Sequence, residues 1–121
     1  MEKNFSGTLA LDLGNTNTVI AFQGERNKDL TLIDIPGITT SPGVIPTAVW
    51  FEGGRDIARI GLSALKKKNF PNSDIYFHSN FKRLIGNPIE RLKEKVLSPT
   101  ESGEKFFEIL WSFLSILFIS I

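Results

Sequence analysis

Cysteine is absent from this chain of 121 residues, and histidine, methionine and tyrosine each occur only once. The missing cysteine excludes disulfides, thiolate zinc sites and thiol nucleophiles. It also fits a reducing compartment, so we expect a cytoplasmic protein. The single histidine, His78, lies in a polar segment with no acidic cluster around it. We therefore expect His78 at the surface and outside any metal or catalytic site.

An excess of charge of one sign is also lacking, since the chain has 14 Lys and Arg residues and 13 Asp and Glu residues, for a net charge of +1. This balance gives no general attraction to nucleic acid, and we expect no nucleic-acid partner. The one tight basic run, 66–68, is typical of a solvated helix face. The uncharged stretch Ile109–Ile121 would span only about 20 Å as a helix, which is short of a ~30 Å hydrocarbon core. Membrane association is therefore not the expected role.

Two common nucleotide motifs are missing. The sequence contains neither Gly-x-x-x-x-Gly-Lys-Ser/Thr nor Gly-x-Gly-x-x-Gly, which argues against a P-loop and a dinucleotide fold. Predicted strands come first and predicted helices follow, an α+β order. The expected strands cover 8–13, 18–22, 30–35, 45–51 and 56–60, and the expected helices cover 62–69, 88–96 and the segment from 98, with a short helical turn over 81–85.

Some finer expectations accompany these elements. The polar segment 72–80 predicts irregular structure. Thr100 is the expected N-cap of the last helix, because Ser, Thr, Asp and Asn favour that position. Both tryptophans, Trp50 and Trp111, are expected to serve packing, and Lys82 and Arg83 are expected on a solvated edge.

The stretch that says most about function is Leu9–Phe22, where two apolar predicted strands flank a turn of small residues. The turn, 14–18, contains one Gly, two Asn and two Thr. Such a turn presents backbone N–H groups together with short amide and hydroxyl donors, which suits a phosphate. Asp12 ends the first strand and could hold a hydrated divalent cation. The segment therefore predicts a β-hairpin that binds nucleotide phosphates.

Three separated segments together resemble the nucleotide-binding domain of the seventy-kilodalton heat-shock chaperones of the DnaK type. The first is Leu-Asp-Leu-Gly-Asn-Thr-Asn-Thr at 11–18. The second, Ile-Pro-Thr-Ala-Val-Trp-Phe at 45–51, is similar to the family's Pro-Ser-x-Val-x-Phe strand. The third, Phe-Lys-Arg-Leu-Ile-Gly at 81–86, is similar to its Lys-Arg-Leu-Ile-Gly signature.

This resemblance implies an ATP site with Mg²⁺. Asp12 would organise magnesium-bound water, and Gly14, Asn15, Thr16 and Asn17 would contact the β- and γ-phosphates. The family also uses a lysine four residues after a glycine that corresponds to Gly61. That position is Leu65 here, so either a one-residue shift makes Lys66 the catalytic lysine or the catalytic lysine is absent. Asn15 and Asn17 stand where the family usually has Thr and often has Tyr, so we expect weak ATPase activity or none.

The resemblance further implies a partial actin-like ATPase lobe of the ribonuclease H-like kind, with a hairpin-led mixed sheet followed by helices, in the range from α+β to α/β. We expect one incomplete domain, cut short at its C-terminal side. Its parts would be a phosphate-hairpin sheet over 7–36, a smaller subdomain over 37–100 and an apolar helix over 101–121. Unfolded polypeptide clients and co-chaperones would be partners only of a longer chain.

Two other functions stay open. The turn sequence also resembles type III pantothenate kinases, which share the actin-like fold, so a small-molecule kinase is one alternative. A non-catalytic interaction remnant is the other, because a single phosphate hairpin without a base pocket gives little affinity in water.

Overall fold

The structure, a computed structural model, describes residues 7–26, 29–55, 57–86 and 95–119. Of residues 117–119 only the backbone is described. The strands are β1 (Gly7–Leu13), β2 (Asn17–Gly24), β3 (Leu30–Leu32), β4 (Val44–Pro46), β5 (Ala48–Glu52), β6 (Ile57–Ile60) and β7 (Phe77–Ser79). The helices are α1 (Gly61–Leu65), α2 (Ser73–Tyr76) and α3 (Pro99–Ile119), with 3-10 turns η1 (Gly53–Arg55) and η2 (Lys82–Leu84). The chain is thus a small α+β protein.

The first sheet has the order β1-β2-β3, and β4 pairs with β2 beyond the end of β3. The β1–β2 hairpin is confirmed, with Leu13 opposite Thr18 next to the turn and Gly7 opposite Gly24 at the far end. Every pairing between described strands is antiparallel. The expected mixed sheet is therefore wrong for the described part of the chain, because no described crossover brings two parallel strands together.

The chain changes sheets at Thr47. We predicted one strand over 45–51, but β4 pairs with β2 in the first sheet and β5 is the central strand of a second sheet, ordered β6-β5-β7. The backbone N–H of Thr47 donates to the carbonyl of Thr16 at 2.9 Å. Its hydroxyl lies 2.8 Å from that of Thr18, and both residues are buried. These bonds fix the sheet junction against the turn of the hairpin.

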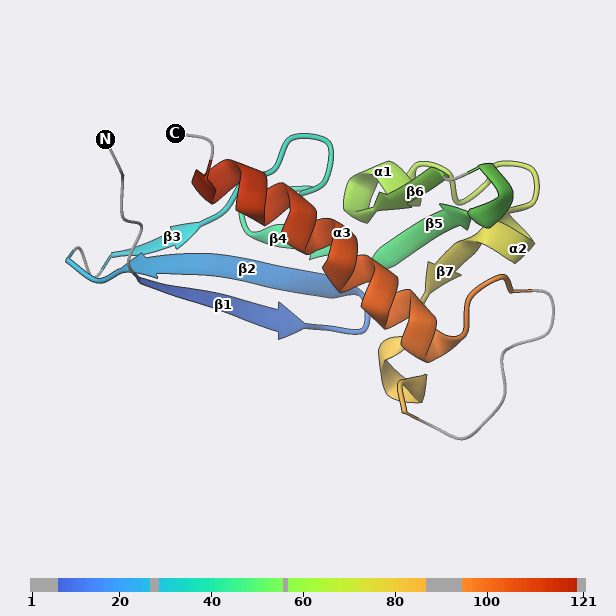
Figure 1. Cartoon of the computed structure of the whole chain (residues 1–121), viewed down its shortest axis with the longest axis horizontal. Coiled ribbons are helices and arrows are strands. Elements are labelled where there is room, and N and C mark those ends of the chain that lie inside the picture. Colours follow the sequence, from blue (N-terminus) through green and yellow to red (C-terminus); the bar gives the residue numbers. More distant parts are fainter. Residues whose placement is uncertain (1–6, 27–28, 56, 87–94, 120–121) are drawn as a thin grey trace.

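The second sheet is covered on both faces. Helices α1 and α2 contact β5 from one side and α3 contacts β5 and β6 from the other, and Figure 1 shows α3 running across both sheets. The α1 side holds a cluster of Ala48, Trp50, Ala64 and Phe77. Because side chains alternate along a strand, Val49 points to the opposite face, into the main core beneath α3.

Helix α3 supplies a large part of that main core. Phe106, Leu110 and Leu114 recur every four residues and are each at most 1 % exposed, so they form one buried stripe along the helix. Burying each such side chain contributes about 1.5–3 kcal/mol. Towards the end of the helix Trp111 is 62 % exposed, so the expectation that it serves packing is wrong. No helix in the described part of the chain is long and apolar enough to cross a membrane.

The start of α3 is a capping box. The Ser98 hydroxyl accepts a bond from the Glu101 N–H at 3.1 Å, and the Ser98 N–H donates to the Glu101 carboxylate at 2.9 Å. Pro99 is the first helical residue, a position where its missing N–H costs nothing. The N-cap is thus Ser98 and not Thr100, whose hydroxyl accepts from the N–H of Gly86 at 3.1 Å.

Several predicted bounds also change. The strand predicted over 30–35 ends at Leu32, and the helix predicted over 62–69 ends at Leu65 and continues as turns. The segment predicted to be irregular, 72–80, contains α2 and β7. The helical turn predicted over 81–85 is confirmed as η2. Most of the helix predicted over 88–96 lies outside the described residues.

Candidate functional site

The turn of the hairpin is built around a glycine that no other residue could replace without rearrangement. A Cβ at Gly14 would lie 2.2 Å from the Asn17 carbonyl oxygen, well inside contact distance. The close approach folds the chain back within three residues, between the end of β1 and the start of β2. The turn therefore presents Asn15 and Thr16 at the end of the hairpin, next to the sheet junction.

These turn residues line an open cleft of about 210 Å³ between the two sheets. Its walls come from the turn, the β4–β5 junction, the end of α1 and the end of β7. The lining residues are Asn15, Thr16, Asn17, Thr40, Pro46, Thr47, Ala48, Leu65, Lys68, Phe77, Ser79 and Asn80. Amide and hydroxyl groups make up most of the polar lining, and Lys68 is the one charged residue among the lining residues. None of these lining residues is a carboxylate.

A hydrogen bond spans the cleft. The amide nitrogen of Asn15 donates to the amide oxygen of Asn80 at 3.2 Å, joining two residues 65 positions apart. Asn80 follows β7 with φ at +54°, a left-handed conformation that Asn tolerates better than most residues. The amide oxygen of Asn15 is buried and has no hydrogen-bond partner among the described residues. The two asparagines thus join opposite walls of the cleft.

The structure gathers some of the predicted site residues and separates others. Asn15, Thr16 and Asn17 all line the cleft, whereas Asp12, Gly14 and Lys66 do not. Asp12 is exposed and lies opposite Val19, on the same face of the hairpin as Asn17 because side chains alternate along β2. Lys66 is exposed after the end of α1.

Several cleft residues were not predicted as site residues, among them Lys68, Ser79 and Asn80. Lys68 belonged to a run that indicated only a solvated helix face, and Ser79 and Asn80 belonged to the segment predicted to be irregular. The left-handed preference of Asn was the one available signal for Asn80. Nothing in the local sequence distinguishes Lys68 from its two lysine neighbours, because their placement depends on how the chain continues after α1.

Asp12 is the candidate carboxylate for Mg²⁺, and it precedes the turn by two residues without lining the cleft. Among the described residues, no three His, Cys, Asp or Glu side chains gather into a metal-binding group. Mg²⁺ commonly keeps several waters and binds through one or two carboxylates together with substrate phosphates. The exposed carboxylate of Asp12 fits that limited role. A site made of protein ligands alone is not present in the described part of the chain.

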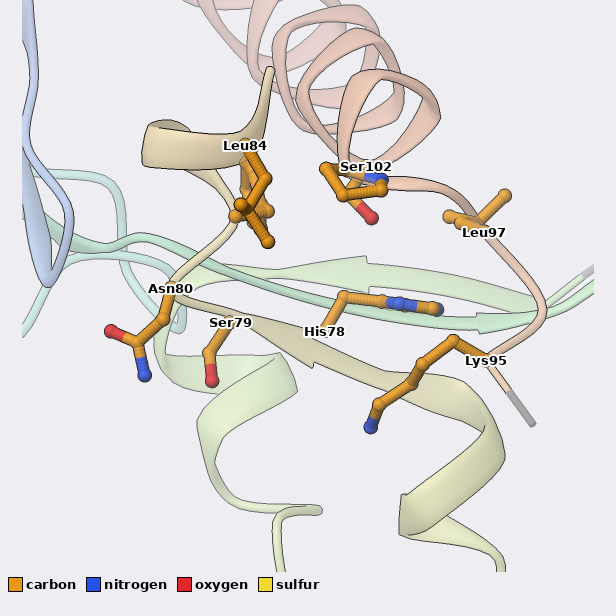
Figure 2. Close-up of a pocket in the computed structure, with 9 residues that line it drawn as sticks. His78, Ser79, Asn80, Leu84, Lys95, Leu97 and Ser102 are labelled. Atoms are coloured by element: carbon orange, nitrogen blue, oxygen red, sulfur yellow. The ribbon is translucent and has the colours of Figure 1, made fainter. Parts of the chain in front are cut away.

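The expectation for His78 is wrong: the residue is only 4 % exposed. It lies on β7 opposite Val49 of β5, on the face covered by α3. A second, smaller cavity of about 120 Å³ adjoins it, lined also by Phe81, Leu84, Lys95, Leu97, Pro99 and Ser102. Ser79 and Asn80 line this cavity as well as the cleft. Figure 2 shows the imidazole between Ser102 of α3 and Lys95, while Ser79 and Asn80 point away from the ring.

Burial keeps His78 neutral. Desolvation, and to a lesser degree the nearby positive charge of Lys95, lower the pKa of His78 from 6.5 to about 4, against a smaller opposing effect of Glu101. The ammonium of Lys95 donates to the Phe77 carbonyl at 2.6 Å. Burial also lowers the pKa of Lys95, with Asp74 opposing the shift. The His78 region is therefore a part of the core that disfavours added charge, unlike the cleft on the other side of β7.

Comparison with known proteins gives no further assignment, since no protein-family model and no curated protein matches the chain.

Proposed function

We propose that the chain binds ATP through its phosphates, with Mg²⁺, in the cleft beside the hairpin turn. The observation that carries this proposal is the lining of the cleft. Asn15, Thr16 and Asn17 face it together with Lys68, and no carboxylate does so among the residues that line it. Amide and hydroxyl donors with one cation favour an anion of high charge, and a phosphate chain is such an anion.

The wider role we infer is that of an ATP-binding segment of a DnaK-like chaperone with a partial actin-like lobe. Its support is the resemblance at 11–18, 45–51 and 81–86. In the structure, residues of the first two segments form the turn side of the cleft, and Asn80 directly precedes the third. Clients and co-chaperones would interact only with a longer chain, in the cytoplasm.

Hydrolysis of ATP by this chain should be weak or absent. The candidate catalytic lysine, Lys66, lies outside the cleft, and Leu65 lines it instead. A leucine can neither stabilise charge that develops on a transferring phosphate nor orient a water molecule. The Asp12 carboxylate would hold magnesium-bound water near the phosphates, which supports binding more than turnover.

Titration calorimetry of the full chain with Mg-ATP tests the proposal. Thr16→Val removes one hydroxyl from the cleft and should weaken binding about fivefold, the value of one neutral hydrogen bond. Thr31→Val is the matched control, because Thr31 is exposed on β3 and does not line the cleft. Wild-type protein that binds no Mg-ATP at millimolar concentration would overturn the proposal, as would an equal loss in both variants.

A small-molecule kinase of the same fold is the second candidate, favoured by the Asp-Leu-Gly-Asn-Thr-Asn-Thr sequence of the turn. Incubation with Mg-ATP and pantothenate distinguishes the two functions. Phosphorylation of pantothenate would support the kinase, whereas ATP binding without transfer supports the chaperone segment.

A further inference from the structure

The three lysines of the basic run 66–68 occupy three different environments. Lys67 lies over the rings of Trp50 and Phe70, with its ammonium 5.2 Å and 4.8 Å from the ring centroids. Lys66 is exposed and lines no part of the cleft, while Lys68 lines it beside Leu65. One lysine thus packs on aromatic rings, one is solvated and one charges the cleft, so the run is not a uniform solvated face.

The end of α1 explains this division. After Leu65 the backbone continues with 3-10 hydrogen bonds, which join residues three apart. The Lys67 N–H donates to the Ala64 carbonyl at 2.9 Å, and the Lys68 N–H donates to the Leu65 carbonyl at 3.1 Å. With about three residues per turn, residues three apart lie on the same side. Lys68 therefore lies above Leu65 and faces the cleft, whereas Lys66 and Lys67 are turned to other sides.

The position of α1 itself is held by Gly61. Its φ of +62° is left-handed, and a Cβ there would lie 2.5 Å from the Ile38 carbonyl oxygen. That same carbonyl accepts a 2.9 Å bond from the N–H of Leu62. Because the start of the helix is fixed in this way, the direction in which its last turn presents Lys68 is fixed too.

The size and chemistry of the cleft limit what it can hold. Its volume of about 210 Å³ is below the roughly 300–1,000 Å³ of pockets that enclose a drug-sized ligand. Phe77 is the one aromatic residue of the lining, and it is buried in the α1-side cluster, where its ring cannot serve as an open stacking platform. The donors and the ammonium suit phosphate oxygens, while a nucleoside base finds no matching surface among the lining residues.

We propose that the cleft recognises the polyphosphate chain alone, irrespective of the nucleoside attached to it, and that Lys68 is the residue that provides its charge selectivity. This inference rests on the proposed phosphate-binding function and adds the ligand class and the cation. ATP, GTP and inorganic tripolyphosphate should therefore compete for the same site.

Titration calorimetry with the magnesium complexes of tripolyphosphate, ATP and GTP tests the inference on the full chain. The three ligands should bind with dissociation constants within about threefold of one another. Lys68→Met should weaken tripolyphosphate binding at least about tenfold, since a hydrogen bond to a charged group is lost. Lys66→Met is the matched control, because it removes the same charge two residues away, and it should change binding less than about twofold.

The outcomes separate this inference from the function on which it depends. Wild-type protein that binds neither Mg-ATP nor tripolyphosphate would overturn both. Binding of Mg-ATP without binding of tripolyphosphate would leave the proposed function standing and overturn recognition of the phosphate chain alone. Equal weakening by Lys68→Met and Lys66→Met would show a general charge effect and overturn the role of Lys68.

Discussion

The two cavities beside β7 are lined by similar polar residue types, but most of these residues are exposed to solvent in the cleft, whereas His78 is buried in the smaller cavity. On the α1 side, the polar lining includes the exposed residues Thr16, Asn17, Lys68, Ser79 and Asn80. On the α3 side, His78 is enclosed by the core and kept neutral. Strand alternation sends His78 towards α3 and Ser79 to the opposite face, and the two cavities meet at Ser79 and Asn80, which line both. We therefore expect changes on the α3 side to alter stability and changes on the α1 side to alter binding.

The largest expected effect is on the α3 side, at Phe81. This residue is 3 % exposed, lines the His78 cavity, and its ring lies 6.5 Å from that of Phe106. Phe81→Ala should lower the free energy of unfolding by about 3–5 kcal/mol, through lost burial and the space left behind. Urea unfolding measures this loss. Trp111→Ala, at an exposed aromatic residue, should change stability by less than about 0.5 kcal/mol, and an equal loss there would contradict the comparison.

The second effect is a pH dependence that arises from His78. Its pKa is about 4 in the folded protein, and 6.5 is the ordinary value, which we take for the unfolded chain. Between pH 4 and pH 6.5 the unfolded chain therefore binds more protons than the folded protein. Stability is then complete above about pH 6.5 and falls as the pH drops towards 4, by about 2–3 kcal/mol. His78→Gln should lack this part of the decline, as measured by urea unfolding at several pH values.

An independent check comes from the histidine being unique in the chain. Its Hε1 proton therefore gives one NMR signal, which should titrate near pH 4. A midpoint near 6.5, together with the same pH profile in His78→Gln, would show that the ring is solvated and would remove the contrast between the two cavities.

The third effect concerns the start of α3, which forms one wall of the His78 cavity. Ser98→Ala removes the hydroxyl of the capping box and should cost about 1 kcal/mol in the free energy of unfolding. Ser112→Ala is the control, because its exposed hydroxyl bonds only to the Glu108 carbonyl within the helix. The affinity for Mg-ATP should stay unchanged in both variants. Weaker ATP binding by Ser98→Ala would show that the two sides of β7 are coupled.

The smallest change in stability is expected on the cleft side, at Asn80. Asn80→Gly keeps the left-handed backbone, so we expect a stability change of less than about 0.5 kcal/mol and a loss of phosphate affinity of about fivefold. Asn72→Gly is a close control, because Asn72 is also left-handed, with φ of +66°, and does not line the cleft. Calorimetry that finds equal ATP binding by the two variants would argue against a role for Asn80.

The hairpin could be predicted from the sequence because its signals are local. Alternating apolar residues and the short Gly-Asn-Thr turn determine both the strands and their register. The same local signals placed Asn15, Thr16 and Asn17 at the turn, and the structure brings all three to the cleft. Ser98 and Glu101 have the Ser-x-x-Glu spacing of a capping box, but our prediction placed the N-cap at Thr100.

The remaining features depend on distant contacts. Residues 45–51 form a continuous β-rich run, and only pairing with β2 on one side and β7 on the other divides them at Thr47. His78 is flanked by Phe77 and polar residues, which gives no periodicity, and its burial comes from β5 and α3. Lys68 differs from its neighbours only through the turns after α1. Such features require the tertiary structure, because no local pattern encodes them.

The most direct measurement is an NMR titration of the full chain with Mg-ATP, following the backbone amides and the His78 imidazole together. The account predicts that signals of Thr16, Asn17, Lys68 and Asn80 shift in a saturable manner while the His78 imidazole stays unchanged. Shifts confined to the His78 side of β7, or no saturable shift at the cleft, would contradict it.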